Sequence, residues 1–156
     1  MSYKPIIIVP GEPNSVFLEI FFKALRKKNY KSPIILVCSA KILSLQMKKL
    51  KFKKKINFLN QKSSINKKLN NKSINIIDIK FNQSRAFYKI SNKSNSYIEE
   101  CFKCAFKLLK KNVTHKFING PISKKTFLNK KFLGMTEFIS SKFKIKKSAM
   151  LIYNEH

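Results

Sequence analysis

The stretch that decides the fold runs from Phe117 to Glu137 and reads Phe-Ile-Asn-Gly-Pro-Ile-Ser-Lys-Lys-Thr-Phe-Leu-Asn-Lys-Lys-Phe-Leu-Gly-Met-Thr-Glu. A short apolar strand over 116–118 ends at Asn119-Gly120-Pro121, because Gly adopts backbone angles closed to other residues and Pro removes a ladder donor. Ser123 then caps a helix over 123–129. The start of that helix offers free backbone N–H groups and Lys124, which suits an anion.

A second loop, Gly134-Met135-Thr136-Glu137, repeats this arrangement. Thr136 is the expected cap of a further helix over 136–143, and Glu137 is an acid at the positive end of that helix. Two helix N-termini are therefore expected to face one cleft.

The rest of the chain alternates between two kinds of apolar pattern. Continuous β-branched runs such as Ile6-Ile7-Ile8-Val9 are typical of strands buried on both faces, and helical stripes lie between these runs. Strands are expected over 5–9, 33–38, 74–79, 116–118 and 149–153, with a short edge strand over 56–59, and helices over 16–28, 40–50, 96–111, 123–129 and 136–143. Since parallel strands need crossover helices, the alternation predicts an α/β fold with a mainly parallel sheet flanked by helices.

Polar residues stand at the other expected helix starts as well. The expected caps are Asn14 or Ser15, Ser39, and Ser94 or Ser96. Glu99 and Glu100 are expected in the first turn of the helix over 96–111, and Glu12 beside the positive end of the first helix, where acids complement the helix dipole.

The three glycines of the chain are informative by their positions. Gly11, Gly120 and Gly134 each fall in a loop between a strand end and a helix start, and the conventional glycine-rich nucleotide loops are excluded. In a parallel α/β sheet such loops meet at the carboxyl edge, where ligands bind. We therefore expect the three glycines to line one cleft, with Thr136 facing into it.

The length of 156 residues, with 44% hydrophobic residues, fits one domain with a real core. No signal-peptide pattern and no run of about 18 apolar residues stands in the sequence. A cytoplasmic protein without a membrane segment is the expectation.

The formal charge of +27 invites a nucleic-acid interpretation. Of the 34 basic residues only Arg26 and Arg85 are arginine, the residue best suited to bidentate recognition, and the lysines are spread along the chain. The abundance of Lys, Asn, Ile and Phe is what a genome rich in A and T encodes. Non-specific binding to nucleic acid is the expectation from charge alone.

The cysteines and histidines give little sign of a metal site. Cys38, Cys101 and Cys104 are too few and too unevenly spaced for a disulfide framework, and we interpret them as buried core thiols rather than as the beginning of a zinc site. His115 precedes a strand in a Lys-rich stretch and is expected on the surface.

Three blocks in order resemble the N-terminal part of the 4-hydroxythreonine-4-phosphate dehydrogenase family. They are Val9-Pro10-Gly11-Glu12-Pro13, Ile118-Asn119-Gly120-Pro121-Ile122-Ser123-Lys124 and Gly134-Met135-Thr136-Glu137-Phe138. The family usually reads Thr-Pro-Gly-Glu-Pro, then Thr-Gly-Pro with a nearby Lys, then Gly-His-Thr-Glu. The resemblance implies an isocitrate/isopropylmalate dehydrogenase-like fold, incomplete here, with residues 1–156 as the N-terminal portion and about half of a family member.

The resemblance also implies a reaction. Family members use NAD or NADP and a divalent metal to oxidise and decarboxylate a small phosphorylated substrate, as homodimers, with three metal-binding histidines beyond the Gly-His-Thr-Glu block. By that block, Thr136 and Met135 are the expected substrate-binding residues. No residue of this chain receives a catalytic, cofactor-binding or metal-binding role, and we expect the chain alone to lack dehydrogenase activity.

A second class of function remains open at this point. The chain could be a non-catalytic, Lys-rich binding protein for RNA or acidic partners. An ordered cleft formed by the glycine loops favours the dehydrogenase family, whereas lysines gathered on one face with exposed aromatic residues favour the binding protein.

Overall fold

The computed structural model describes residues 3–60, 65, 69–128, 131–149 and 151–152. The chain divides into two compact units, residues 1–122 and 123–156, and each is described by itself. The first unit contains β1 (Ile6–Val9), α1 (Phe17–Lys27), β2 (Ile34–Cys38), α2 (Ala40–Lys49), β3 (Ile56–Phe58), β4 (Ile74–Asp78), the 3-10 turn η2 (Asn92–Ser94), α3 (Asn95–Lys110) and β5 (Lys116–Asn119). The second unit contains the single π-helical turn η3 (Lys124–Leu128) and α4 (Met135–Phe143).

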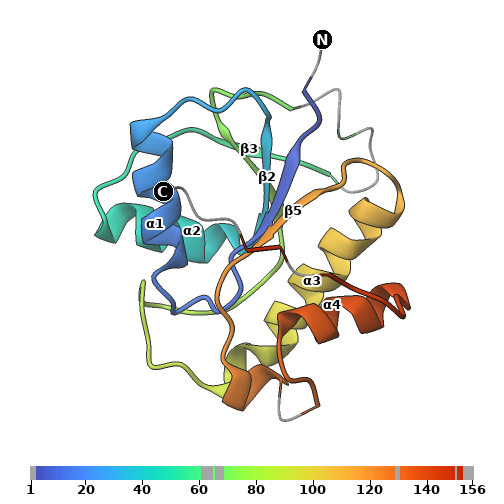
Figure 1. The fold of residues 1–156 in the computed structure, drawn as a ribbon. Helices are drawn as coiled ribbons and strands as arrows, with labels where there is room; N and C mark the ends of the chain where they lie inside the picture. Colours follow the sequence, from blue (N-terminus) through green and yellow to red (C-terminus); the bar gives the residue numbers. More distant parts are fainter. Residues whose placement is uncertain (1–2, 61–64, 66–68, 129–130, 150, 153–156) are drawn as a thin grey trace. The chain divides into compact units, whose positions relative to one another are not determined.

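The described strands of the first unit form one sheet in the order β3-β4-β2-β1-β5 (Figure 1). Each pairing is parallel and in register, for example Ile7 opposite Ile35 and Ile7 opposite Phe117. The prediction of a mainly parallel α/β sheet is confirmed. The short strand expected over 56–59 is present as β3, at one edge of the sheet.

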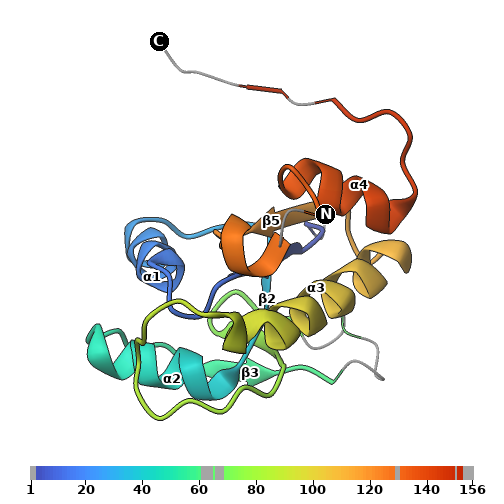
Figure 2. The same ribbon diagram turned by 90° about the horizontal axis from the view of Figure 1, so that it is seen from below.

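The two faces of the sheet are covered by different helices. One face, with Ile8, Leu36 and Ile76, packs beneath α1 and α2, which lie together in both ribbon views (Figures 1 and 2). The other face packs against α3, where Phe117 of β5 makes edge-to-face contacts with the rings of Phe102 and Phe106. Each such buried side chain contributes about 1.5–3 kcal/mol to folding, so central strands that are apolar on both faces hold the two layers together.

The cap expected at the start of α2 is confirmed. The side chain of Ser39 accepts a hydrogen bond from the Ile42 amide at 3.4 Å, as expected for a cap. Asp78, at the end of β4, adds a second acceptor for this helix, since its Oδ1 accepts from the Ala40 amide at 2.9 Å. The carboxyl end of the sheet is thereby fixed to the start of α2.

The start of α3 differs from expectation. The helix begins at Asn95, so Glu99 and Glu100 lie beyond its first turn, and the prediction that they complement the helix dipole is wrong. They pair instead with Lys103 one turn further along. Ser94 is the N-cap residue, but its side chain makes no cap hydrogen bond and turns to Glu12.

In the second unit one expected cap is confirmed and another is wrong. Ser123 Oγ accepts from the Thr126 amide at 3.2 Å. Thr136 does not cap α4, because the extended backbone of Gly134 makes Gly134 the N-cap residue and places Thr136 inside the first turn. An N-cap side chain accepts from the amides of the second and third helical residues, and the Thr136 hydroxyl lies too far along the helix to do so.

The strand expected over 149–153 is not formed by the described residues of that range. Ala149, Leu151 and Ile152 lie in no strand, and Leu151 and Ile152 are 92% and 85% exposed. Met150 and Tyr153 lie outside the described residues. A strand is stable only when a neighbouring backbone pairs with it, and an apolar sequence supplies no such pairing by itself.

Candidate functional site

The loops at the carboxyl edge of the sheet form the candidate site of the first unit. From β1 the chain passes to β2 on one side, whereas β5 lies on the other side of β1. This point of reversal is where open parallel sheets bind ligands. The loop Pro10–Asn14 after β1, the segment 79–94 after β4, and Gly120-Pro121 after β5 all begin at this edge.

Gly11 and Gly120 allow the loop after β1 and the loop after β5 to cross with their main chains in direct contact. The Glu12 amide donates to Pro121 O at 2.9 Å, and the Gly120 amide donates to Val9 O at 2.8 Å. Gly11 has φ +75°, and a Cβ on it would overlap Pro121 O. A Cβ on Gly120 would overlap Pro10 O. The space that a side chain would fill is therefore occupied by the opposite backbone.

This crossing bears on the cofactor that the resemblance implies. Both glycines are buried, so neither offers the open backbone cradle that a dinucleotide pyrophosphate requires. Gly11 and Gly120 lie together in a backbone crossing, and neither is among the residues that line the clefts described below. The part of the prediction that adds Gly134 and Thr136 spans the two units and stays a prediction.

Glu12 is a buried carboxylate at the centre of the loop after β1. It is 2% exposed. Its Oε2 accepts from Ser94 Oγ at 2.8 Å, and its Oε1 accepts from the amide and the side-chain nitrogen of Asn14 at 3.2 and 3.3 Å. A buried charge is costly unless it is hydrogen-bonded, so these donors account for its position.

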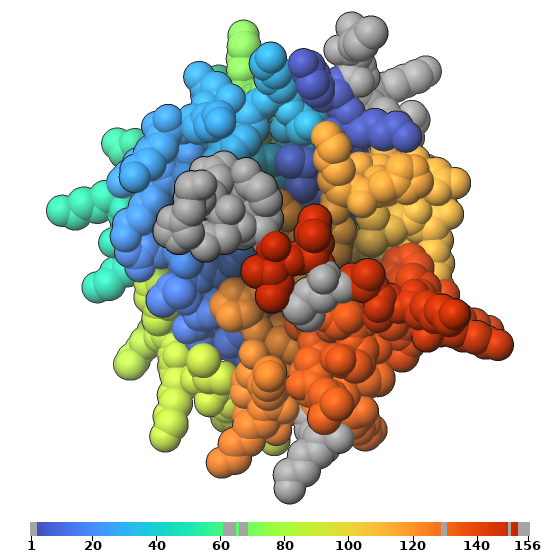
Figure 3. Space-filling view, viewed as in Figure 1, coloured from blue at the N-terminus to red at the C-terminus, as the bar shows by residue number. Residues whose placement is uncertain are grey.

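Two further side chains join the loop after β1 to the segment after β4. Asn14 Oδ1 accepts from Gln83 Nε2 at 3.0 Å and from the Tyr88 amide at 2.9 Å. Gln46 Nε2, on α2, donates to Pro13 O at 2.7 Å and to Ala86 O at 2.9 Å. The space-filling view shows the yellow-green segment after β4 lying against the blue segment after β1 (Figure 3).

Sequence reasoning missed Gln46, although a signal was present. Gln46 stands on the apolar stripe of α2, between Leu43 and Met47, and is fully buried. A polar residue on the buried face of an amphipathic helix must find partners, and here those partners are two loop carbonyl groups. Its own carbonyl oxygen, Oε1, is buried without a hydrogen-bond partner among the described residues.

An open cleft of about 670 Å³ lies beside this network. Its lining residues are Asn14, Phe81, Asn82, Gln83, Ser84, Tyr88, Lys89, Ser91, Lys93 and Ser94. A neighbouring cleft of about 430 Å³ shares Phe81 and Asn82 with it and reaches Ser39 and Asp78 at the ends of β2 and β4. These spaces are on the edge of the sheet where a ligand is expected.

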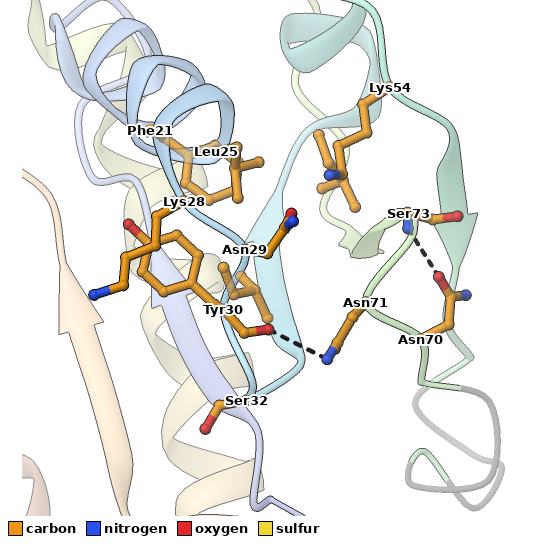
Figure 4. A pocket seen from close by; sticks show the side chains of 12 residues that line it. Phe21, Leu25, Lys28, Asn29, Tyr30, Ser32, Lys54, Asn70, Asn71 and Ser73 are labelled. Atoms are coloured by element: carbon orange, nitrogen blue, oxygen red, sulfur yellow. Dashed lines mark hydrogen bonds between the residues drawn. The ribbon is translucent and has the colours of Figure 1, made fainter.

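A smaller hollow lies at the opposite, amino edge of the sheet (Figure 4). Asn71 closes it by donating to Tyr30 O at 3.3 Å and Lys31 O at 3.0 Å, and Asn70 accepts from the Ser73 amide at 2.8 Å. Its volume is about 30 Å³, against about 670 Å³ and 430 Å³ for the two clefts at the carboxyl edge. This hollow is not a metabolite site.

The three cysteines lie in the core as interpreted from the sequence. Cys38, Cys101 and Cys104 are buried free thiols. Burial raises the pKa of the Cys38 thiol, and raises the pKa of Cys101 to about 12 and that of Cys104 to about 11. Such thiols remain protonated and unreactive at neutral pH.

The described residues do not fit a divalent metal. Within residues 3–60, 65, 69–128, 131–149 and 151–152, no three His, Cys, Asp or Glu side chains gather as possible ligands. His115 is exposed, as expected for a surface residue. Met135 and Thr136 are half-buried at the start of α4, and their substrate-binding role stays a prediction.

No helix in the described part of the chain is long and apolar enough to span a bilayer.

The sequence matches known proteins over most of its length. A family model described as pyridoxal phosphate biosynthetic protein PdxA matches residues 29–156. A protein named 4-hydroxythreonine-4-phosphate dehydrogenase from Wigglesworthia glossinidia brevipalpis is 30% identical over 159 residues, which cover 96% of this chain and 45% of that protein.

Solved structures of two proteins share the fold. The 4-hydroxythreonine-4-phosphate dehydrogenase from Burkholderia phymatum superposes with a TM-score of 0.75 at 19% identity, over 93% of this chain and 45% of that one. A putative 4-hydroxythreonine-4-phosphate dehydrogenase from Salmonella typhimurium gives 0.72 at 18% identity, over 88% and 44%. The chain spans a little under half the length of the relatives it matches. By the match over residues 29–156, the chain belongs to the PdxA family of pyridoxal phosphate biosynthetic proteins.

Proposed function

We propose that the chain is the N-terminal portion, residues 1–156, of an oxidoreductase that oxidises and decarboxylates 4-phosphohydroxythreonine in pyridoxal phosphate biosynthesis. The observation that carries the proposal is the family match over residues 29–156, which includes both the Gly120 loop and the Gly134-Met135-Thr136-Glu137 block. The parallel sheet, with its loops gathered at one edge, is a fold suited to that chemistry.

In this proposal the chain contributes the scaffold and part of the substrate contacts. Thr136 has a hydroxyl that can donate to or accept from a polar substrate, and the amides in the first turn of α4 lack a side-chain cap. Met135 stands where the family has His. A thioether is only a weak acceptor, so we infer that this chain contacts its substrate there through Thr136 more than through Met135.

The metal and the nicotinamide are proposed to be held elsewhere. The described residues offer neither three metal ligands nor an open glycine loop, so no step through either group is assigned to them. We propose that NAD or NADP and the divalent metal bind residues in the part of the relatives that this chain does not span. A homodimer in the cytoplasm is the corresponding assembly and location.

Growth of a pyridoxine-requiring bacterial strain that lacks the dehydrogenase tests this function. The chain joined to the C-terminal portion of the Wigglesworthia relative should restore growth without added pyridoxine, and the chain by itself should not. The matched control is the joined chain with Thr136→Ala, which should restore growth poorly. Failure of the joined chain, with both portions present as folded protein, would reject the proposed function.

A further inference from the structure

We propose that the cleft between the loop after β1 and the segment after β4 is a preformed site for a small phosphorylated anion, with Lys89 and Lys93 supplying the charge. The cleft, of about 670 Å³, lies at the carboxyl edge of the sheet. The inference rests on the proposed function only for the identity of the natural ligand. The binding itself is argued from the cleft.

Two of the residues that line the cleft are buried and polar. Ser94 and Gln83 line it and are 2% and 7% exposed. Ser94 is held by Glu12, and Gln83 Nε2 is held by Asn14 Oδ1 and by Arg85 O at 2.7 Å. Buried polar groups that are hydrogen-bonded in a network specify one arrangement and resist rearrangement.

Three ties join the two walls, and each comes from a different side chain of the first unit. They are Glu12 to Ser94, Asn14 to Gln83 and Tyr88, and Gln46 to Pro13 and Ala86. Since each tie spans from the β1 loop or α2 to the segment after β4, the walls cannot separate without breaking these hydrogen bonds, including the buried one between Ser94 and Glu12. A ligand therefore meets a cleft whose shape is already set, which lowers the ordering cost of binding.

The chemistry of the lining selects the class of ligand. Two lysines, several hydroxyl groups and no carboxylate line the cleft. Lys89 and Lys93 are exposed, and neither has a carboxylate partner among the described residues. Glu12, the acid to which Ser94 is bonded, is buried and already accepts from three donors. Phosphate oxygens accept hydrogen bonds from both ammonium and hydroxyl groups, so a phosphomonoester complements this surface.

A second cleft of the same unit provides a matched control for charge alone. It has a volume of about 610 Å³ and two lysines, Lys107 and Lys111, but it contains the carboxylate of Asp78. Removing either pair of lysines changes the net charge of the protein equally. If the cleft, rather than the overall charge, binds the anion, only the removal of Lys89 and Lys93 should weaken anion binding.

The whole chain is titrated separately with O-phospho-L-serine, inorganic phosphate and L-serine. Binding is monitored by calorimetry and by changes in amide NMR shifts. Phosphoserine and inorganic phosphate should shift the amides of residues 81–94, and L-serine should not. K89Q/K93Q should weaken phosphoserine binding by about tenfold, as expected for two lost charge contacts, and K107Q/K111Q by less than about twofold. Asn14→Ala, which leaves the charge unchanged, should weaken it by about threefold or more.

Equal weakening by the two lysine pairs, or the absence of saturable binding, would overturn the site. If inorganic phosphate binds as tightly as phosphoserine, the cleft is a site for the free phosphate ion, and a phosphorylated metabolite is rejected as its ligand. Loss of binding in K89Q/K93Q supports the cleft even if the growth test fails. Restored growth of the joined chain that is indifferent to Lys89 and Lys93 would leave the proposed function standing and reject the cleft.

Discussion

Ser94 Oγ donates a 2.8 Å hydrogen bond to Glu12 Oε2, across 82 residues of sequence. Both side chains are 2% exposed. The bond fixes the residue before α3 to the loop after β1, so the two loops that flank the candidate cleft depend on each other. A charge-assisted bond of this kind contributes about 1.5–3 kcal/mol when its partners are buried.

Glu12→Gln should destabilise the first unit by about 1–3 kcal/mol. With its amide nitrogen toward Asn14, Gln would face two donors; with it toward Ser94, the Ser94 hydroxyl would have to accept and turn its proton to Ser91 O. In both orientations the bonds to a charged acceptor are lost. Urea unfolding followed by circular dichroism measures the change. Glu19→Gln is the control, since Glu19 makes an exposed pair with Lys23 and its loss should cost less than about 0.5 kcal/mol. Equal effects of the two substitutions would contradict the role of Glu12.

Gly120→Ala should destabilise the chain by about 3 kcal/mol or more, because the new methyl group would overlap the main-chain oxygen of Pro10 and crowd Phe17. Gly134→Ala is the matched substitution. A Cβ there meets only the side-chain end of Glu137, at 3.2 Å, and the change should stay within about 1 kcal/mol. Thermal unfolding of the two variants and the parent protein measures these changes in stability. A Gly120→Ala protein as stable as the parent would show that the backbone crossing is absent.

Stability should fall as the pH rises above 9. The thiols of Cys101 and Cys104 have an ordinary pKa of 9.0, and in the fold burial raises the pKa to about 12 and about 11. Below pH 9 both thiols are protonated in the folded and unfolded chain. Between pH 9 and about 11 only the unfolded chain loses these protons, so unfolding becomes favoured by up to roughly 1.4 kcal/mol per pH unit for each thiol.

Urea unfolding between pH 8 and 11 measures this slope. Cys101→Ala and Cys104→Ala should each make the slope shallower, and comparison with the parent protein removes the contribution of all other groups. An unchanged slope in both variants would mean that the thiols are not held protonated by burial.

The sheet could be read from the sequence because its strands are continuous β-branched runs and its helices carry apolar stripes. Ile6–Val9 and Ile34–Cys38 fall within a residue of their predicted bounds for this reason. The segment 149–153, Ala-Met-Leu-Ile-Tyr, is also apolar, but an apolar sequence does not supply a neighbouring strand. Residues 149, 151 and 152 accordingly lie outside any strand.

The polar contacts of the site could be read only in part. Gly11 and Gly120 are identifiable as special backbone positions, but the contact that requires them joins residues more than a hundred positions apart. Ser94 or Ser96 was expected to cap α3 by local rules, but the Ser94 hydroxyl donates to the buried carboxylate of Glu12 instead. Gln46 is recognisable afterwards as a polar residue on an apolar stripe. Such long-range partners follow from the tertiary fold and not from local pattern.

Binding to nucleic acid, where it occurs, should be weak, indifferent to sequence and steeply dependent on salt. Of 34 basic residues only two are arginine, so the charge acts through counterion release without base recognition. Fluorescence anisotropy with two labelled oligonucleotides of unrelated sequence, from 50 to 300 mM salt, measures it. Tight binding to one of them that persists at the highest salt would point to a dedicated nucleic-acid surface.

The most direct test of the proposed function is turnover of 4-phosphohydroxythreonine, followed as NAD(P) reduction together with carbon dioxide release. The purified chain, with NAD or NADP and a divalent metal supplied, is compared with the chain joined to the C-terminal portion of the Wigglesworthia relative. A metal that activates a hydroxyl needs about three protein ligands, and the described residues gather no such set. We predict metal-dependent turnover by the joined chain and none by the short chain above its metal-free background. Turnover by the short chain, or inactivity of a folded joined chain, would contradict the account.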